Sequence, residues 1–167
     1  MQRNPRSKMT CSVARATEVV GERWTILVLR EAFQGVTRFD VFEKNLGIAP
    51  NILAARLKKL VEAGVLETMP VQDGGRRREY RVTAMGRDFF PAYVALMQWG
   101  DRWLADEAGP PVVLQDRAVG APVPRLSVLS EAGEALDHTK IRRVPGPGAS
   151  DHLKRRIAAE HQMEQGR

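Results

Sequence analysis

The stretch LGIAPNILAARLKKLVEAGVL, residues 46–66, contains the features that decide the fold. Its apolar residues recur at the spacing of one helix face. They are Ile52, Leu53, Leu57, Leu60 and Val61. Pro50 suits the first helical position, since its missing N–H would be unpaired there, and Gly64 suits the residue just past the end. We therefore expect a helix that begins at Pro50, buries one face and leaves the other free to bind.

A shorter helix is expected immediately upstream. Phe39, Phe42 and Leu46 have helical spacing, and residues 47–49 form a connection of the length found in a helix-turn-helix. Ala49 offers no side-chain oxygen to the first N–H groups of the following helix, which leaves these groups for a phosphate or for water. Such a pair of helices holds the second one out from the body of the protein.

The residues downstream have the composition of a β-hairpin. β-branched and apolar residues fill 65–71 and 79–83, and glycines lie in the segment between them, 72–77. A basic run stands where a wing would meet the DNA backbone, and it consists of Arg76, Arg77 and Arg78. Turn, helix and basic hairpin together predict a DNA-binding winged helix.

The winged-helix interpretation gives different roles to different residues. Specificity is expected from the exposed front of the helix, where an Asn amide can pair with adenine and an Ala methyl can contact a thymine methyl. The residues there are Asn51, Ala54, Ala55 and Lys58. Salt-dependent contacts to phosphates or to the minor groove are expected from the other cations. These are Arg38, Arg56, Lys59, Arg76, Arg77 and Arg78. Arg56 could equally pair with Glu62 or with a residue of the neighbouring helix.

Further helices are expected at 11–20 and 23–33, and the second is apolar almost all round, so it should be largely buried. After the hairpin, Thr83 can cap a helix that Pro91 either kinks or begins. Large apolar residues crowd this helix: Phe89, Phe90, Tyr93, Leu96, Met97, Trp99, Trp103 and Leu104. A small domain has little spare core for all of them, so part of this face should contact a second copy of the chain. Packing within one chain is the alternative.

In combination, these residues resemble the HxlR-type winged helix-turn-helix regulators of bacteria, a MarR-like family. The matching residues are Cys11 to Arg15, Gly21 to Arg30, Arg38, Phe39, Leu53, Arg56, Leu57, Leu60, Gly64 to Leu66, Arg78 to Thr83, Gly86 and Trp99. The resemblance implies a homodimeric transcription factor that binds a palindromic operator in double-stranded DNA, with dimer contacts from helices at both ends of the domain. The dimerisation residues expected on this basis are Val13, Phe89, Tyr93, Leu96, Trp99 and Trp103. Repression is favoured over activation, because occlusion of a promoter needs only binding.

The composition changes after residue 108. Short strands are expected at 112–114, 124–129 and 140–144, separated by Gly, Pro and Ser. This segment resembles the C-terminal extension of some longer family members, whose Cys-Gly elements suit a zinc ribbon. Val119 and Leu129 stand where those thiols would be. We therefore expect no metal site, and apolar packing by these two side chains instead.

The predicted fold is mainly α with small β: a winged helix-turn-helix with a flanking dimerisation helix and a small C-terminal β appendage. Its predicted parts are a flexible arm at 1–10, a DNA-binding and dimerisation domain at 11–108, a β extension at 109–149 and a short C-terminal helix or tail at 150–167. Ser150 can cap that last helix, and Leu153, Ile157 and Met163 are expected to face inward.

Cys11 is the only cysteine, which excludes a disulfide within the chain. In similar regulators a cysteine at this place senses oxidants or electrophiles. Arg15, Lys8 or the start of the first helix could lower the pKa of the thiol and so favour that role. A small buried residue that packs the dimer interface is the favoured alternative.

The chain has 167 residues and a formal net charge of +6, which favours a polyanionic partner. No apolar run approaches the ~20 residues of a membrane span, and the N-terminus has no signal-peptide core, so we expect a cytoplasmic protein. The sequence has no nucleophile elbow, phosphate-binding glycine loop or metal-ligand spacing, so neither an enzyme nor a bound cofactor is expected. The alternative function is a winged-helix module for protein–protein contact. A small-molecule effector beside the Trp99/Trp103 helix is a further candidate partner.

Overall fold

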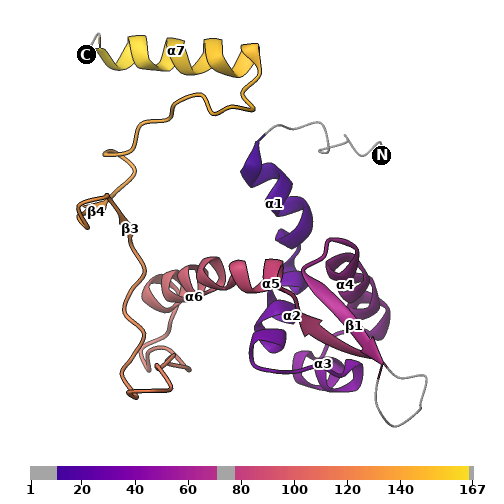
Figure 1. Ribbon diagram of the computed structural model, residues 1–167. Coiled ribbons are helices and arrows are strands. Elements are labelled where there is room, and N and C mark those ends of the chain that lie inside the picture. The colour runs from indigo at the N-terminus through magenta and orange to yellow at the C-terminus, as the bar shows by residue number, and fades with distance from the viewer. Residues whose placement is uncertain (1–10, 71–77, 166–167) are drawn as a thin grey trace. The chain divides into compact units, whose positions relative to one another are not determined.

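The computed structural model describes residues 11–70 and 78–165 of the chain (Figure 1). Contacts between residues divide the described chain into two units, of which the first comprises Thr17–Leu126. The second combines residues 11–16 with 127–165. Each unit is described by itself below.

The helices and strands follow the order of a winged helix-turn-helix. They are α1 (Ser12–Val20), α2 (Arg23–Phe33), α3 (Phe39–Leu46), α4 (Pro50–Glu62), β1 (Leu66–Pro70), β2 (Arg78–Val82), α5 (Ala84–Asp88) and α6 (Phe90–Trp103). The predicted helix at 23–33 and the predicted start of the next long helix at Pro50 are confirmed. The mainly α fold with a small antiparallel sheet is therefore confirmed as well.

The core of the first unit lies where α2, α3 and α4 meet the hairpin. Leu53, Leu57 and Leu60 recur on one face of α4 and are fully buried. They belong to one cluster with residues from α2, α3 and the start of the hairpin: Val28, Leu29, Ala32, Phe42, Ile48, Val65 and Leu66. Burial of each leucine side chain contributes about 2 kcal/mol to folding. Since this face of α4 is committed to the core, its opposite face is left for solvent or a ligand.

Two glycines turn the chain at the ends of α3 and α4. Gly47 follows α3 with φ of 58°, and Gly64 follows α4 with φ of 76°, so both residues lie in the left-handed region that favours glycine.

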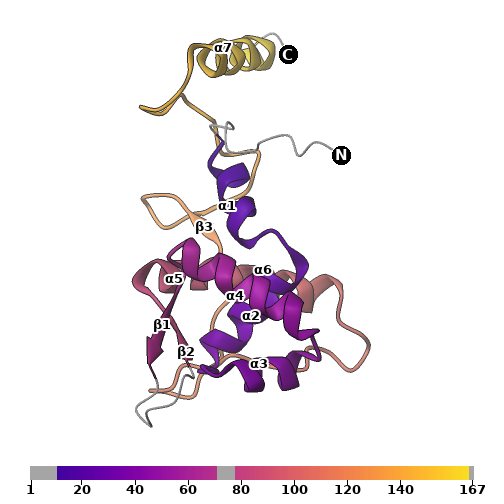
Figure 2. The ribbon, with the colours of Figure 1, turned by 90° about the vertical axis from the view of Figure 1, so that its right-hand side faces the viewer.

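Strands β1 and β2 pair antiparallel, with Leu66 opposite Val82 and Pro70 opposite Arg78. The hairpin leaves the helical core beside α4, as both ribbon views show (Figures 1 and 2).

The base of the hairpin is joined to the end of α4 by Thr83. Its hydroxyl donates to the carbonyl of Gly64 at 2.6 Å and accepts from the N–H of Gly86 at 3.1 Å. Thr83 is thus a helix cap as expected, but the helix that it caps is the short α5 and not the apolar helix α6. Gly86 is buried against the chain here: a Cβ atom on it would lie 2.4 Å from the carbonyl oxygen of Val65 and 2.7 Å from Cγ1 of Val82. This residue must therefore lack a side chain if the joint is to close.

Helix α6 begins at a break directly after α5. Pro91 lies in the first turn of α6, so it begins this helix and does not kink a longer one. The ring of Phe33 at the end of α2 packs against Phe90 and Tyr93, with ring centroids 5.1 and 5.4 Å apart. These contacts hold the start of α6 against α2.

Residues 109–126 belong to the first unit, which differs from the predicted boundary at residue 108. The physical reason is a pair of hydrogen bonds from one side chain of α6. Gln98 donates to the carbonyl of Pro124 at 3.1 Å and accepts from the N–H of Leu126 at 2.8 Å. Within this segment an isolated bridge pairs Gln115 with Pro122.

The second unit contains the two-residue strands β3 (Val128–Leu129) and β4 (Ala135–Leu136) and the helix α7 (Asp151–Gln165). Of the three predicted strands, only part of 124–129 is a strand in the described chain, and 112–114 and 140–144 belong to no strand. The expected apolar packing of Val119 and Leu129 is wrong, because these side chains are 73% and 58% exposed.

The expected helix near the C-terminus is confirmed. The hydroxyl of Ser150 accepts a hydrogen bond from the N–H of Leu153 at 3.3 Å. Ile157 is buried and Leu153 is half-buried, but Met163 is exposed, which corrects its expected inward position. Among the residues that the structure describes, no helix is long and apolar enough to span a membrane.

We predict that Gly86→Ala destabilises the protein by about 2 kcal/mol, because the new methyl group would force the backbone of β1 and α5 apart. A urea denaturation curve measures the change. Gly100→Ala is the matched control, since no atom lies within 4 Å of its Cβ position in α6. That variant should be unchanged or slightly more stable, and an equal loss in both variants would contradict the proposed close contact at Gly86.

Candidate nucleic-acid interface

The exposed face of α4 presents the four residues expected to read bases. Asn51, Ala54, Ala55 and Lys58 are all exposed, while the leucines of the same helix are buried. Small uncharged side chains in the middle of such a face permit close approach to a flat or grooved surface. The structure thus brings these residues together on one side of the helix.

Lys58 is the cation of this face. Its ammonium group lies 3.7 Å from the carboxylate of Glu62, one turn further along α4, and both side chains are more than 60% exposed (76% and 65%). An exposed pair of this kind contributes little and is easily exchanged for another anion. Lys58 therefore remains available to a polyanion.

Arg56 and Lys59 lie on a different side of α4, where both pair with Glu22. The guanidinium of Arg56 contacts one carboxylate oxygen, and the ammonium of Lys59 donates to the other at 2.9 Å. Glu22 occupies the N-cap position of α2. Of the two alternatives that the sequence left for Arg56, Glu62 and a neighbouring helix, the structure shows the second type of partner.

This ion pair limits what Arg56 can contact. Its side chain is only 22% exposed, and its Nε atom is buried without a hydrogen-bond partner in the described part of the chain. A half-buried cation of this kind depends on its carboxylate, because neither charge is fully solvated. Sequence reasoning did not identify Glu22, since partners this far apart in the sequence have no spacing signal; Lys59 and Glu22, for example, are 37 positions apart.

Arg38 lies next to the hairpin. It precedes α3, forms a backbone bridge with Glu79 of β2, and pairs with Asp40 through hydrogen bonds of 3.1 and 2.8 Å. The Arg38 side chain beside Asp40 lowers the pKa of that carboxyl, which stays ionised and offsets part of the arginine's charge. Arg78 is exposed at the start of β2. Arg76 and Arg77 lie outside the described residues.

Glu31 is a buried acid that the sequence did not single out. Its Oε1 atom accepts two hydrogen bonds from Arg30, at 3.0 and 2.8 Å, and its Oε2 atom accepts one from Asn45 at 2.8 Å. Asn45 is the second-last residue of α3, close to the helix-turn-helix connection. The buried carboxylate therefore links α2 to the end of α3.

The large apolar residues of α6 divide between two faces. Trp99 and Trp103 are 54% and 62% exposed, and Leu96 is exposed beside them. Phe89 and Tyr93, expected in the same group, instead pack against the core and against Phe33 of their own chain. Val13 is exposed on α1, in the part that belongs to the second unit. The exposed residues of α6 form an unusually apolar surface for a single chain in water.

Cys11 is exposed directly before α1. Backbone N–H groups of Ala14 and Val13 hydrogen-bond to the sulfur and lower the pKa of the thiol. The start of the first helix was one of the expected causes. Within a single chain Cys11 is exposed, and its packing at a dimer interface stays a prediction.

A family model described as HxlR-like helix-turn-helix matches residues 19–108. The chain belongs to this family. An HTH-type transcriptional regulator from Mycobacterium tuberculosis is 45% identical over 137 residues, which is 82% of this chain and 87% of that protein.

Two solved structures are similar to this chain over more residues than the family model matches. The candidate transcription factor PA1607 has a TM-score of 0.80 at 43% identity, and the match covers 84% of this chain and 98% of that one. The candidate transcription factor PA1374 from Pseudomonas aeruginosa has a TM-score of 0.62 at 40% identity, with 87% and 99% covered. The family resemblance expected from the sequence is confirmed, and the chain is a helix-turn-helix transcriptional regulator.

We predict that Glu22→Gln destabilises the protein by about 1–2 kcal/mol, because it leaves the half-buried charge of Arg56 without its carboxylate. Glu62→Gln is the matched control: it removes the same charge from an exposed pair and should change stability by less than about 0.5 kcal/mol. Urea unfolding of the two variants measures the difference. Equal losses would show that the Glu22 cluster is no more than a surface ion pair.

Proposed function

We propose that this HxlR-like protein is a homodimeric repressor that binds a palindromic operator, with α4 in the major groove. The observation that carries the proposal is the division of α4 into a fully buried leucine face and an exposed face formed by Asn51, Ala54, Ala55 and Lys58. A winged helix with such a face presents it to base edges, while its hairpin lies along the backbone. Family membership supports the same function.

Different residues contribute differently to this binding. Asn51 and the two alanines are the candidates for base readout, because an amide can pair with adenine and a methyl group can contact thymine. Lys58, Arg38 and Arg78 are candidates for phosphate contacts, since all are exposed. Arg56 and Lys59 hold α4 against Glu22, so we now propose that they set the angle of the helix more than they contact DNA.

A second copy of the chain is the partner that fits the exposed apolar residues of α6. Leu96, Trp99 and Trp103 lie within two turns of this helix and are too large and apolar to remain in water as a group. A two-fold dimer through α6 would place two α4 helices on one side, which is the arrangement that reads two half-sites of a palindrome. Repression then needs only occupancy of the promoter.

The exposed thiol of Cys11 makes an oxidant or an electrophile one candidate signal. Its lowered pKa increases the thiolate fraction, and the thiolate is the nucleophile. A disulfide would need a second copy of the chain, because Cys11 is the only cysteine.

For DNA binding, we predict that Lys58→Ala weakens binding to an operator selected from random DNA. The slope of log affinity against log salt concentration should fall in magnitude by about 1, the value expected for the loss of one phosphate contact. Asn51→Ala should instead relax the choice of base at one position per half-site, with a loss of about tenfold for the preferred base. Fluorescence anisotropy over a salt titration measures both effects. Lys44→Ala, which removes an exposed charge from α3, is the matched control for Lys58.

The outcome separates the proposed function from its alternative. Selective binding that responds to Asn51 and Lys58 but not to Lys44 supports a sequence-specific regulator. Weak binding to any DNA, abolished by salt and indifferent to Asn51, would favour a winged-helix module for protein–protein contact.

For assembly, we predict that the double variant Trp99→Glu and Trp103→Glu raises the dimer dissociation constant by at least about tenfold, because two charges would enter an apolar interface. Sedimentation equilibrium measures the constant. Val144→Glu, another exposed apolar residue, serves as the control and should leave the dimer unchanged. A dimer that survives the double variant would show that α6 is not the interface.

A further inference from the structure

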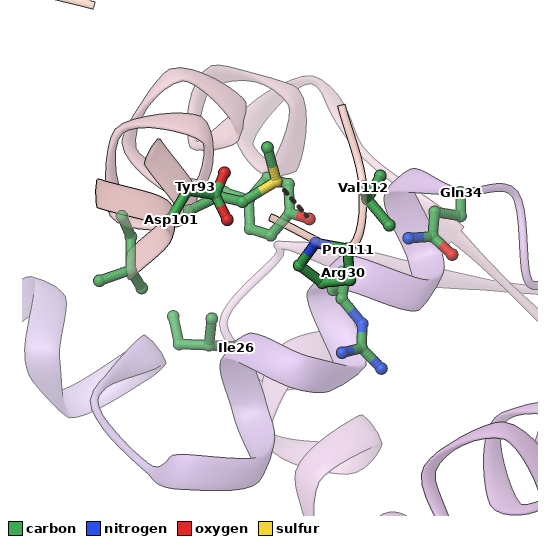
Figure 3. A pocket seen from close by; sticks show the side chains of 9 residues that line it. Ile26, Arg30, Gln34, Tyr93, Asp101, Pro111 and Val112 are labelled. Carbon is green, nitrogen blue, oxygen red and sulfur yellow. Dashed lines mark hydrogen bonds between the residues drawn. The ribbon is translucent and has the colours of Figure 1, made fainter. Parts of the chain in front are cut away.

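A cavity of about 240 Å³ lies between α2 and α6 in the first unit (Figure 3). Ile26, Met97, Pro111 and Val112 supply apolar walls. The polar side chains of the lining are those of Arg30, Gln34, Tyr93 and Asp101. Small-molecule sites have this character, although most are larger, so the cavity suits a ligand of about one ring.

One wall of the cavity comes from the segment that follows the winged helix. Pro111 and Val112 supply this wall, and further along the same segment Gln98 of α6 binds the backbone of Pro124 and Leu126. The intervening loop is closed by a hydrogen bond of 2.8 Å from the N–H of Val123 to the carbonyl of Leu114. The cavity is therefore a built feature of the first unit and not a gap beside a loose chain end.

The charges around the cavity do not cancel. Arg30 directs two nitrogen atoms to Glu31, at 3.0 and 2.8 Å, so its positive charge is offset. Asp101 has no ion-pair partner among the described residues, and its side chain is partly buried. Figure 3 shows the Asp101 carboxylate and the Arg30 guanidinium on opposite sides of the cavity. The side of the cavity nearest Asp101 is therefore negative.

Tyr93 adds an aromatic ring and a weakly bonded hydroxyl to this side. Its hydroxyl donates to the sulfur of Met97 at 3.8 Å, which is a weak acceptor (Figure 3). Burial raises the pKa of Tyr93 and outweighs the opposing charge of Arg30, so the hydroxyl stays protonated. An aromatic ring close to a carboxylate that has no ion-pair partner suits an organic cation.

We propose that this cavity binds a small organic cation, with its ammonium group at Asp101 and Tyr93 and its apolar body against Met97 and Pro111. The cation acts as the effector of the regulator, and this part rests on the proposed DNA-binding function. Two structural connections would transmit cation binding from the cavity to the proposed dimer interface and to the helix-turn-helix. Helix α6 holds Tyr93, Met97 and Asp101 on one face and the exposed tryptophans on another, while Glu31 links Arg30 to Asn45 at the end of α3.

The test uses two probes that share a phenyl ring and differ in charge, phenyltrimethylammonium and benzenesulfonate. Isothermal titration calorimetry of the full chain should show at least about tenfold tighter binding of the cation. Asp101→Asn should abolish that preference. Asp88→Asn, which removes an exposed carboxylate of α5, is the matched control and should retain it.

A second variant keeps the test independent of any folding defect at Asp101. Val112→Lys places a cation at the exposed edge of the cavity and should exclude phenyltrimethylammonium without affecting the core, because Val112 is 55% exposed. Equal affinity for the two probes, or full cation binding by both variants, would overturn the proposed site.

The same titration is then repeated on the complex with operator DNA. A change in operator affinity of at least about threefold with the cation, absent in Asp101→Asn, supports the effector role. Cation binding with unchanged operator affinity would overturn that role. Failure of the wild-type protein to bind DNA selectively would instead count against the proposed function, and it leaves the calorimetric result on the cavity intact.

Discussion

Burial of the leucine face of α4 is the constraint on which the rest of the first unit depends. Leu53, Leu57 and Leu60 are completely inaccessible, and each contributes about 2 kcal/mol. A rotation of α4 about its axis would expose them, so the orientation of the helix is tightly held. The same constraint determines which residues face outward, because side chains one residue further along the helix lie about 100° away.

The ion pairs at Glu22 restrict the position of α4 in addition to the burial of its leucine face. Apolar contacts resist rotation of α4 but permit a small slide along its neighbours, since they are not directional. Two cations one turn apart on α4, Arg56 and Lys59, both bind one carboxylate at the start of α2. The basic residues of α4 therefore fall into two classes, of which one positions the helix and the other, represented by Lys58, remains in solvent.

Local patterns predicted the first unit well because its elements are determined by local physics. Pro50 and Gly64 delimit α4, Thr83 caps α5, and a period of 3.6 residues separates the faces. The partners of charged residues could not be predicted in this way. The pairing of Arg56 with Glu22 depends on the packing of two helices, and the inward position of Tyr93 depends on contact with Phe33.

The segment after α6 shows why composition alone misplaced a boundary. Gly and Pro after residue 108 indicated a separate appendage, with Val119 expected to pack in place of a lost thiol. In the structure Val119 is exposed, and the segment is held instead by the amide of Gln98, which binds backbone atoms and so leaves no pattern in the sequence of its partners. A polar side chain that binds backbone tolerates substitution of the residues it holds. The attachment of Pro124 and Leu126 to α6 therefore does not depend on the side chains of these two residues.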